Sequence, residues 1–404
     1  MRILQVNKFF YVRGGSERYF FDLCRLLEKR GHAVAHFSMK HERNLPSEDS
    51  PFFVTTIDLN APMGSGSKMR AAARVIYSYE ARKRIAQVMD AEKPDIVHFH
   101  NISRQLSPSI VDAVHSRGIP MVETLHDLFL VCPAHSCFVD GQPCEACTSG
   151  DFWHVVPKRC IDGSRASSLL GCMESYLHAW LGLYKKIGRF IAPSLFLKSR
   201  VASLGWTTDR LVHLPYFVPL GPDYSRRTDG YVLFTGRIST EKGVGTLLEA
   251  AGLARAVDFV LAGEGPELES FKYQARRLGL TNVRFVGYVK GDALERLLEG
   301  ACCVVVPSIS YENLPLSILE AFARGKPAIA ADSGGIAELV RDEVTGYLFD
   351  RGVAVSLADA AERICSDHGR RTKMGRTARE IVSREYSPES HYQKLMAIYQ
   401  DVTR

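Results

Sequence analysis

Two glutamates stand eight positions apart in the segment YENLPLSILEAFARGKP, at Glu312 and Glu320. Pro315 between them predicts the start of a helix, because the fixed φ angle of proline suits the first helical position. The free amide groups near Leu316 and Ser317 would point out of the positive end of this helix and favour a phosphate. A diphosphate seated there, with a carboxylate on either side to accept hydroxyl protons, describes a nucleotide sugar. For either glutamate alone, a solvated helix with ordinary acidic residues is the simpler interpretation.

Two short apolar runs enclose this helix, at residues 301–306 and 327–331. Continuous apolar runs of this length predict buried strands of a parallel sheet. The helix between them is expected to end at Gly325, which can adopt the left-handed conformation of a helix cap. The unit is therefore strand–helix–strand, with its loop at the carboxyl end of a strand, where open α/β sheets bind ligands.

The spacing E-x7-E, followed by EAFARGKPAIA and a Gly-Gly turn ending in Glu338, resembles glycosyltransferase family 4. This is a group of retaining enzymes with the GT-B fold. The resemblance covers nearly the whole chain and is strongest from Tyr231 to Phe349. It implies an α/β protein of two Rossmann-like, doubly wound parallel-sheet domains that face a central cleft. The expected divisions are an acceptor-side domain at 1–215, with a cysteine-rich insertion near 132–172, and a nucleotide-sugar domain at 216–386. A helix at 387–404 is expected to cross back to the first domain.

The resemblance also implies roles for the second half of the chain. Arg237 and Lys242, in the pattern G-R-x4-K-G, would hold the donor diphosphate and stabilise the charge that builds as it departs. Glu312 would orient the donor sugar, and Glu320 would bind the ribose diol. Asn313 departs from the glycine of many relatives, so side chains narrow this loop. The other candidates for donor binding are Gly236, Gly263, Gly265, Gly287, Tyr288, Leu316 and Ser317.

The first half opens with a predicted strand at residues 3–6, a loop at Gly14 and Gly15, and a helix from about Ser16 to Arg30. Ser16 is a candidate cap for that helix. The loop reads Arg-Gly-Gly-Ser, so the dinucleotide fingerprint G-x-G-x-x-G is absent. The resemblance implies that the two glycines approach the donor phosphate or the acceptor, although glycine serves a tight turn equally well.

Histidines gather at the carboxyl ends of predicted strands at 96–100 and 121–125. His126 follows in the sequence TLHD, which is similar to the family's position for a histidine beside the transferred sugar. An imidazole there could hydrogen-bond a sugar hydroxyl or stabilise developing charge. His98 and His100 are interpreted as structural or acceptor-side residues.

Six of the ten cysteines fall between Cys132 and Cys172. The spacing of Cys132, Cys144, Cys147 and Cys160 suits a structural zinc site, with buried, inert thiols as the alternative. Disulfides are not expected in a cytosolic chain. The resemblance implies a loop element, and its place directly after His126 suggests that it shapes the acceptor pocket.

The net charge of +6 resides in the first half, where residues 1–215 carry 27 Lys and Arg against 20 Asp and Glu. A surface formed by these basic residues could contact anionic lipid or an acceptor that carries a diphosphate. An ordinary solvated helix face explains the excess of basic residues too. Nucleic-acid binding is not expected, because aromatic residues do not alternate with the basic ones.

The apolar helix predicted at 167–186 is interpreted as core, with a membrane-resting face as the alternative. No apolar run approaches the ~20 residues of a membrane span, and the first residues form a strand, so the expected location is the cytoplasm, in part at the inner face of the membrane.

Together these features predict a retaining hexosyltransferase that moves a sugar from a nucleotide diphosphate donor to an alcohol acceptor. The acceptor is expected to be a saccharide or lipid-linked, in surface polysaccharide or glycolipid assembly. No catalytic cofactor is expected, since two cations stand where a metal would lie and no Asp-x-Asp motif occurs. The resemblance implies a front-face mechanism in which the leaving diphosphate helps to deprotonate the acceptor. A nucleotide-sugar epimerase or hydrolase of the same fold, and a non-catalytic sugar-nucleotide-binding module, are the alternatives.

Overall fold

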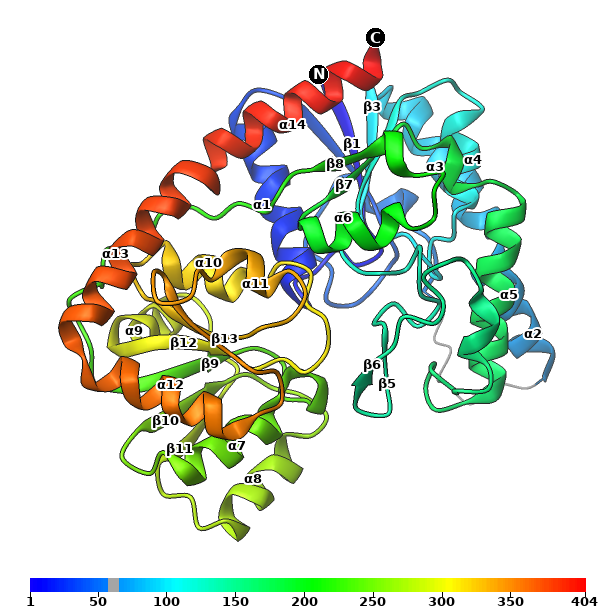
Figure 1. The fold of residues 1–404 in the computed structure, drawn as a ribbon. Coiled ribbons are helices and arrows are strands. Elements are labelled where there is room, and N and C mark those ends of the chain that lie inside the picture. The colour runs from blue at the N-terminus through cyan, green and yellow to red at the C-terminus, as the bar shows by residue number, and fades with distance from the viewer. Residues whose placement is uncertain (57–64) are drawn as a thin grey trace. The chain divides into compact units, whose positions relative to one another are not determined.

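The computed structural model describes residues 1–56 and 65–404 and divides the chain into two compact units. The first unit contains Met1–Cys137, Glu145–Leu214 and Tyr392–Arg404, and the second contains Phe138–Cys144 and Pro215–His391. Each unit is built on a six-stranded parallel sheet (Figure 1). Residues 138–144, which the sequence places in the first domain, form the short hairpin of β5 (Phe138–Val139) and β6 (Gln142–Pro143) and group with the second unit.

The sheet of the first unit has the strand order β2-β1-β3-β4-β7-β8. Its four inner strands are short and almost wholly buried, because helices follow the strands and cover the sheet, whereas the edge strands β2 and β8 are only partly buried. The strands are β1 (Arg2–Val6), β2 (Ala33–Phe37), β3 (Ile96–Phe99), β4 (Met121–Thr124), β7 (Arg189–Ala192) and β8 (Leu211–His213). The helices are α1 (Gly15–Lys29), α2 (Ser65–Ile76), α3 (Tyr79–Glu92), α4 (Ser109–His115), α5 (Arg165–Trp180) and α6 (Leu195–Ala202). Single 3-10 turns lie at Ser50–Phe52, Phe152–Val155, Tyr184–Lys186 and Thr208–Arg210.

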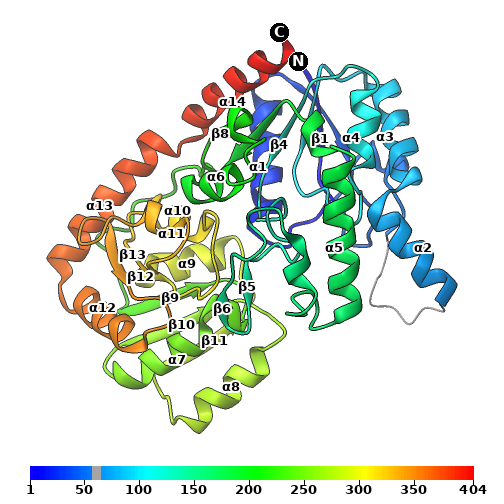
Figure 2. The same ribbon diagram turned by 45° about the vertical axis from the view of Figure 1, so that its right-hand side comes forward.

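Two local predictions in the first unit are wrong. Helix α1 is capped by Gly14 with no side-chain hydrogen bond, and the Ser16 hydroxyl donates to Glu17 instead. Helix α5 ends at Trp180, so the predicted apolar helix is shorter and does not lie wholly in the core. Leu183 and Tyr184 beyond it are buried, whereas Trp180 is 80% exposed. Figures 1 and 2 show α5 alongside α2 within this unit.

Helix α14 (Pro388–Thr403) ends in the first unit, where Tyr399 is fully buried. The Tyr399 hydroxyl lies 2.7 Å from Nδ1 of His98 on β3 and 3.4 Å from the Gln5 amide on β1. Arg189 on β7 forms an ion pair of 2.7 Å with Asp401. These contacts attach residues 392–404 to three strands of the sheet.

The sheet of the second unit has the order β11-β10-β9-β12-β13-β14. Its strands are β9 (Tyr231–Thr235), β10 (Asp258–Ala262), β11 (Val283–Gly287), β12 (Ala301–Val306), β13 (Ala328–Ala331) and β14 (Gly346–Phe349). Its helices are α7 (Val244–Leu253), α8 (Leu268–Arg277), α9 (Asp292–Gly300), α10 (Leu316–Phe322), α11 (Ile336–Leu339), α12 (Ala354–Ser366) and α13 (His368–Glu385), with a 3-10 turn at Thr240–Lys242. One hydrophobic core joins one face of the sheet to α7 and α12.

Lys326, between α10 and β13, is a buried structural residue at 2% exposure. Its amino group donates to the carbonyl oxygens of Glu299 and Ala301, each at 2.8 Å, and to that of Arg227. Burial lowers the pKa of Lys326 to about 8. Part of the EAFARGKP signature therefore serves the fold.

The loops at the carboxyl ends of β9, β10, β11 and β12 are held together through their backbones. A side-chain carbon on Gly263 would collide with the carbonyl oxygen of Gly236, and one on Gly243 would collide with that of Pro307. Gly263 also donates its amide to Gly287 at 2.8 Å. Glycine at these positions allows four loops to approach at one edge of the sheet.

The contact at Gly243 gives a paired test of this packing. Gly243 has a φ of +74°, so Gly243→Ala adds both backbone strain and a collision, and we expect it to lower the free energy of unfolding by at least about 2 kcal/mol. Gly245→Ala, two residues on in α7, has its nearest neighbour at 3.8 Å and is expected to be neutral or to stabilise by about 0.5–1 kcal/mol. Chemical denaturation of both variants measures the difference. Equal effects of the two substitutions would contradict the packing argument.

Candidate active site

The centre of the candidate site is a partly buried ion pair between Lys242 and Glu312. The Lys242 Nζ atom lies 2.5 Å from Glu312 Oε1, and the Ser308 hydroxyl donates to the same oxygen at 2.6 Å. The two side chains are 28% and 15% exposed. Lys242 follows β9 and Glu312 follows β12, which are neighbours in the sheet. The two residues that the sequence assigned to the diphosphate and to the sugar therefore contact each other.

The ion pair keeps the Glu312 carboxylate charged. Burial by itself raises the pKa of Glu312, but the charge of Lys242 and hydrogen bonds from Lys242 and Ser308 outweigh it. The more distant charge of Arg237 acts in the same direction, and the pKa lies below its ordinary value. At neutral pH the group is therefore an acceptor only, suited to hydroxyl groups of a ligand.

Arg237 lies on the same loop and is more accessible. Its guanidinium forms an ion pair of 2.7 Å with Glu241, and its side chain is 56% exposed. The carbonyl oxygen of Glu241 accepts the amides of Ile309 at 3.0 Å and Ser310 at 3.2 Å. The loop that carries both predicted cations is thus attached by its backbone to the loop that carries Glu312.

Helix α10 begins one residue later than predicted. Pro315 is its N-cap in an extended conformation, and Leu316 is the first helical residue. The Leu316 side chain is buried, and Ser317 and Glu320 are partly buried. The amide of Ile318 is paired with the carbonyl oxygen of Pro315 at 3.2 Å, and the amides of Leu316 and Ser317 precede it at the helix start. The phosphate role of this helix start stays a prediction.

The predicted glycines have packing roles that the sequence did not specify. The amide of Gly236 donates to Ala262 at 3.1 Å, and a side-chain carbon on Gly265 would collide with the carbonyl oxygen of Ile238. Gly287 has a positive φ of 72°, and the Tyr288 side chain after it is 60% exposed. Asn313 is partly buried beside Glu312. The donor-binding roles of these residues stay predictions.

In the first unit, the predicted histidines form one hydrogen-bonded group at the ends of β3 and β4. His98 joins Tyr399 at 2.7 Å and Thr124 at 2.8 Å. Nδ1 of His100 lies 3.0 Å from Nε2 of His126, and its Nε2 lies 2.8 Å from Gln5. His98 and His100 are buried and structural, whereas His126 is only partly buried.

The His126 imidazole is neutral over the physiological range. Burial lowers its pKa to about 3, with a further lowering by Lys8 and an opposing effect of Asp127. Burial also holds the pKa of His100 well below its ordinary value. His126 can therefore exchange hydrogen bonds with a hydroxyl group but offers no positive charge.

Sequence reasoning missed two partners of this strand end. His135 Nδ1 lies 3.1 Å from Asp127 Oδ2, and this contact and Lys8 hold the pKa of Asp127 at about 2 against the opposite effect of burial. Burial lowers the pKa of Lys8, and Asp127 and Glu17 oppose that shift. The only sequence feature that pointed to a role for Lys8 is its place as a polar residue shortly after the buried strand β1. Ser308 after β12 carried the same signal in the second unit.

The remaining predicted residues show no ligand geometry of their own. Gly14 caps α1 in an extended conformation, and Gly15 is the first residue of that helix.

Cys132 and Cys147 are buried, and Cys144 and Cys160 are partly buried. Within residues 1–56 and 65–404, no group of three or more His, Cys, Asp or Glu side chains is arranged to hold a metal ion. The structure does not gather the four cysteines as zinc ligands, and the zinc site stays a prediction.

Comparison with known proteins gives matches along both units. Residues 13–221 match the family model of Glycosyltransferase Family 4, and residues 224–381 match that of Glycosyl transferases group 1. The chain is 36% identical to the D-inositol 3-phosphate glycosyltransferase of Salinispora tropica, over 96% of this chain and 80% of that protein. It is 31% identical to the alpha-D-kanosaminyltransferase of Streptomyces kanamyceticus over 42% of this chain. This second match spans only 45% of the relative's length.

Solved structures resemble the fold over its full length. The sucrose-phosphate synthase of Thermosynechococcus elongatus has a TM-score of 0.73 at 19% identity, covering 99% of this chain and 98% of that chain. Anabaena HepE in complex with UDP-glucose has a TM-score of 0.65 at 18% identity, and the match covers 99% of this chain and 100% of that chain. These likenesses show the fold, which is the GT-B fold of two Rossmann-like units.

The protonation state of His126 can be measured directly. In the unfolded chain a histidine takes up a proton near pH 6.5, whereas folded His126 does so only near pH 3. The unfolded state therefore binds more protons below pH 6.5, and this residue makes the free energy of unfolding fall as the pH decreases from 6.5 towards 3. We expect the ring resonance of His126, assigned with a His126→Gln variant, to stay constant in NMR spectra from pH 8 to 5. A titration midpoint near 6.5 would contradict the burial argument.

Proposed function

The chain belongs to glycosyltransferase family 4, and we propose that it transfers a sugar from a nucleotide diphosphate donor to a hydroxyl group of an acceptor, with retention of configuration. The observation that carries the proposal is the Lys242–Glu312 pair, with Arg237 on the same loop, at the carboxyl edge of a parallel sheet. Cations and a carboxylate at one place match a donor that joins a diphosphate to a polyhydroxylated sugar.

In this proposal the ion pair holds Lys242 and Glu312 in position to bind the donor. An ammonium group has three N–H donors, so Lys242 can keep its contact with Glu312 and also bind a diphosphate oxygen. Arg237 is exposed enough to approach the same diphosphate from the loop. The two charges stabilise the leaving group as the sugar–oxygen bond breaks, and they are already in place before the reaction. Glu312, charged and acceptor-only, orients the sugar through its hydroxyl groups, and Glu320 binds the ribose diol.

The acceptor side is proposed to lie in the first unit. His126 is neutral, so it would accept or donate a hydrogen bond to a sugar hydroxyl rather than supply charge. The departing diphosphate takes the acceptor proton in the front-face mechanism. None of the described helices has the length and hydropathy of a membrane span.

The proposal is tested with a panel of nucleotide sugars and the release of nucleotide diphosphate. Release that depends on an added acceptor supports transfer. Release without an acceptor, or isomerised donor, supports the hydrolase or epimerase alternative, and no release on a full panel supports a binding module.

With the active donor, we expect Lys242→Ala and Arg237→Ala each to lower turnover by two to three orders of magnitude, about 3–4 kcal/mol, the usual loss for one preorganised charge stabiliser.

Matched controls come from helix α8. Lys272 forms a surface ion pair of 2.8 Å with Glu269, and Arg277 ends the same helix. Lys272→Ala and Arg277→Ala remove the same side chains elsewhere and should leave turnover within about twofold, as surface changes usually do. Near-wild-type turnover of Lys242→Ala or Arg237→Ala at saturating donor would refute the proposed diphosphate site.

We also expect transfer to need no divalent cation, because Arg237 and Lys242 supply the positive charge that a metal would otherwise bring. Turnover should survive EDTA. Loss of activity that magnesium or manganese specifically restores would contradict the assignment. Since EDTA could also remove a structural zinc ion, rescue by magnesium is the decisive comparison.

A further inference from the structure

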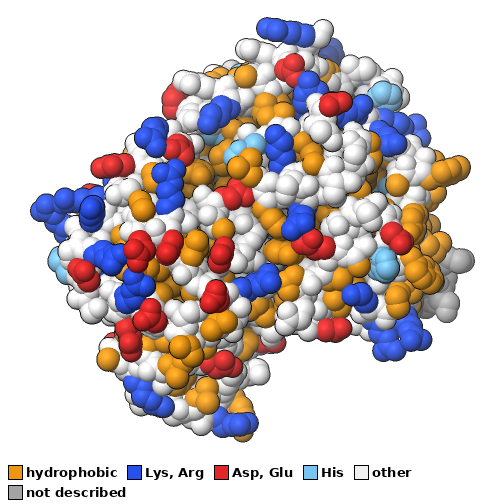
Figure 3. All heavy atoms as spheres, in the orientation of Figure 1, with side chains coloured by type: hydrophobic (Ala, Val, Ile, Leu, Met, Phe, Trp, Pro, Cys, Tyr) orange, Lys and Arg blue, Asp and Glu red, His pale blue; other side chains and the backbone are white. Residues whose placement is uncertain are grey.

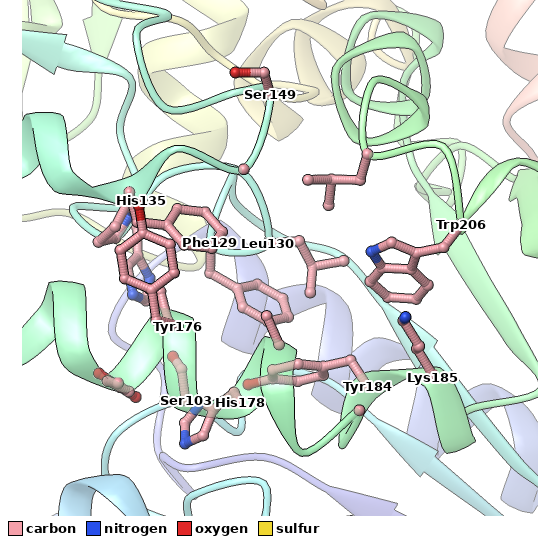
Figure 4. Close-up of a pocket in the computed structure, with 18 residues that line it drawn as sticks. Ser103, Phe129, Leu130, His135, Ser149, Tyr176, His178, Tyr184, Lys185 and Trp206 are labelled. Atoms are coloured by element: carbon pink, nitrogen blue, oxygen red, sulfur yellow. The ribbon is translucent and has the colours of Figure 1, made fainter.

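A cavity of about 260 Å³ lies in the first unit between α5, the loop after β4 and residues 204–206 (Figure 4). Its walls are largely aromatic and aliphatic. The aromatic residues are Phe129, Phe152, Tyr176, Tyr184 and Trp206, and Leu130 and Leu204 lie among them. A cavity with such walls favours an apolar occupant, because burial of apolar surface is the main favourable term in its binding.

Four of the polar side chains that line the cavity have partners in the protein, and a fifth, Glu174, is buried with a pKa that burial raises. His178 Nε2 lies 2.8 Å from the carbonyl oxygen of Ile76, and the Ser175 hydroxyl donates to that of Gly171 at 2.9 Å. His135 is joined to Asp127, and the Tyr176 hydroxyl donates to Asp151 at 2.9 Å. A sugar ring in the cavity would give up its hydration for few new hydrogen bonds. A hydrocarbon chain has no such cost.

The outer face of α5 continues the apolar surface. Leu169, Met173, Tyr176 and Trp180 follow the spacing of one helical face, and all four are more than 40% exposed. Tyr176 belongs both to this face and to the cavity wall. Figure 3 shows hydrophobic side chains gathered along its right-hand edge, over α5.

The cavity is also connected to the proposed acceptor side. His135 lines it and is hydrogen-bonded to Asp127, the neighbour of His126 in sequence. Lys185 lines it as well, with its amino group 5.9 Å from the centre of the Trp206 ring. Figure 4 shows Lys185 and Trp206 at the side of the cavity opposite to His135.

We propose that this cavity binds the hydrocarbon chain of a lipid-linked acceptor. As an acceptor site it rests on the proposed transferase function. A cavity of 150 Å³ holds one benzene molecule, so 260 Å³ accommodates about ten carbon atoms. The first unit therefore selects acceptors by their lipid portion.

The test measures binding in the absence of any donor. Octyl glucoside, kept below its micelle concentration, and methyl glucoside are titrated into the full chain by calorimetry. We expect octyl glucoside to bind at least about tenfold more tightly, because each buried methylene adds to affinity. Ala179→Trp places an indole at the cavity wall and should weaken octyl glucoside binding by about tenfold or more. Ala166→Trp, on an exposed position of the same helix away from the cavity, should leave it within about twofold.

Several outcomes would overturn the proposal. Equal affinities for the two glucosides would mean that the sugar is bound and the chain is not. Octyl glucoside binding that Ala179→Trp leaves unchanged would assign it to the outer face of α5. Circular dichroism of both tryptophan variants confirms that they fold. Failure of the transferase proposal appears separately, as absence of nucleotide diphosphate release from the donor panel, and does not alter the glucoside affinities.

Discussion

The close approach of backbones at the carboxyl edge of the second sheet is the constraint on which the candidate site depends. Gly243 meets Pro307, and Gly263 meets Gly236, at distances that leave no room for a side-chain carbon. The loop of Arg237 and Lys242 is therefore fixed against the loop of Glu312 by main-chain packing. Charges held in this way need little rearrangement when a ligand's charge develops, which is the property that makes electrostatic stabilisation effective.

The strands of this edge could be predicted from sequence almost residue by residue. Residues 301–306 form a strand with the predicted bounds, and the strand predicted at 327–331 begins one residue later, because a strand covered on both faces must be apolar throughout. The position of Glu312 after a strand followed from the same reasoning, whereas Lys242 was indicated by the family resemblance. What places them together is the order β9 next to β12, which is a property of the whole sheet and leaves no local signal.

Other features were beyond a reading of local pattern. Helix α5 is rich in apolar residues around much of its circumference, so composition predicted burial, and only packing decides that Trp180 is exposed while His178 is buried. Ser16 has the side chain of a helix cap, yet its hydroxyl bonds to Glu17. Lys326 belongs to a motif that was used only as a mark of resemblance, and three carbonyl oxygens surround its amino group. In each case the deciding partner is distant in sequence or depends on backbone geometry.

The attachment of residues 392–404 to the first unit has a consequence for the order in which the protein matures on the ribosome. Synthesis proceeds from the N-terminus, and domains usually fold as they emerge. Here the residues of the second unit have all been made by His391, while the first still lacks Tyr399, the buried side chain that contacts β1 and β3. The unit that begins the chain is thus the later one to be completed. Until Tyr399 has been made, His98 on β3 and Gln5 on β1 lack their buried hydrogen-bond partner, so the sheet of the first unit cannot reach its final packing.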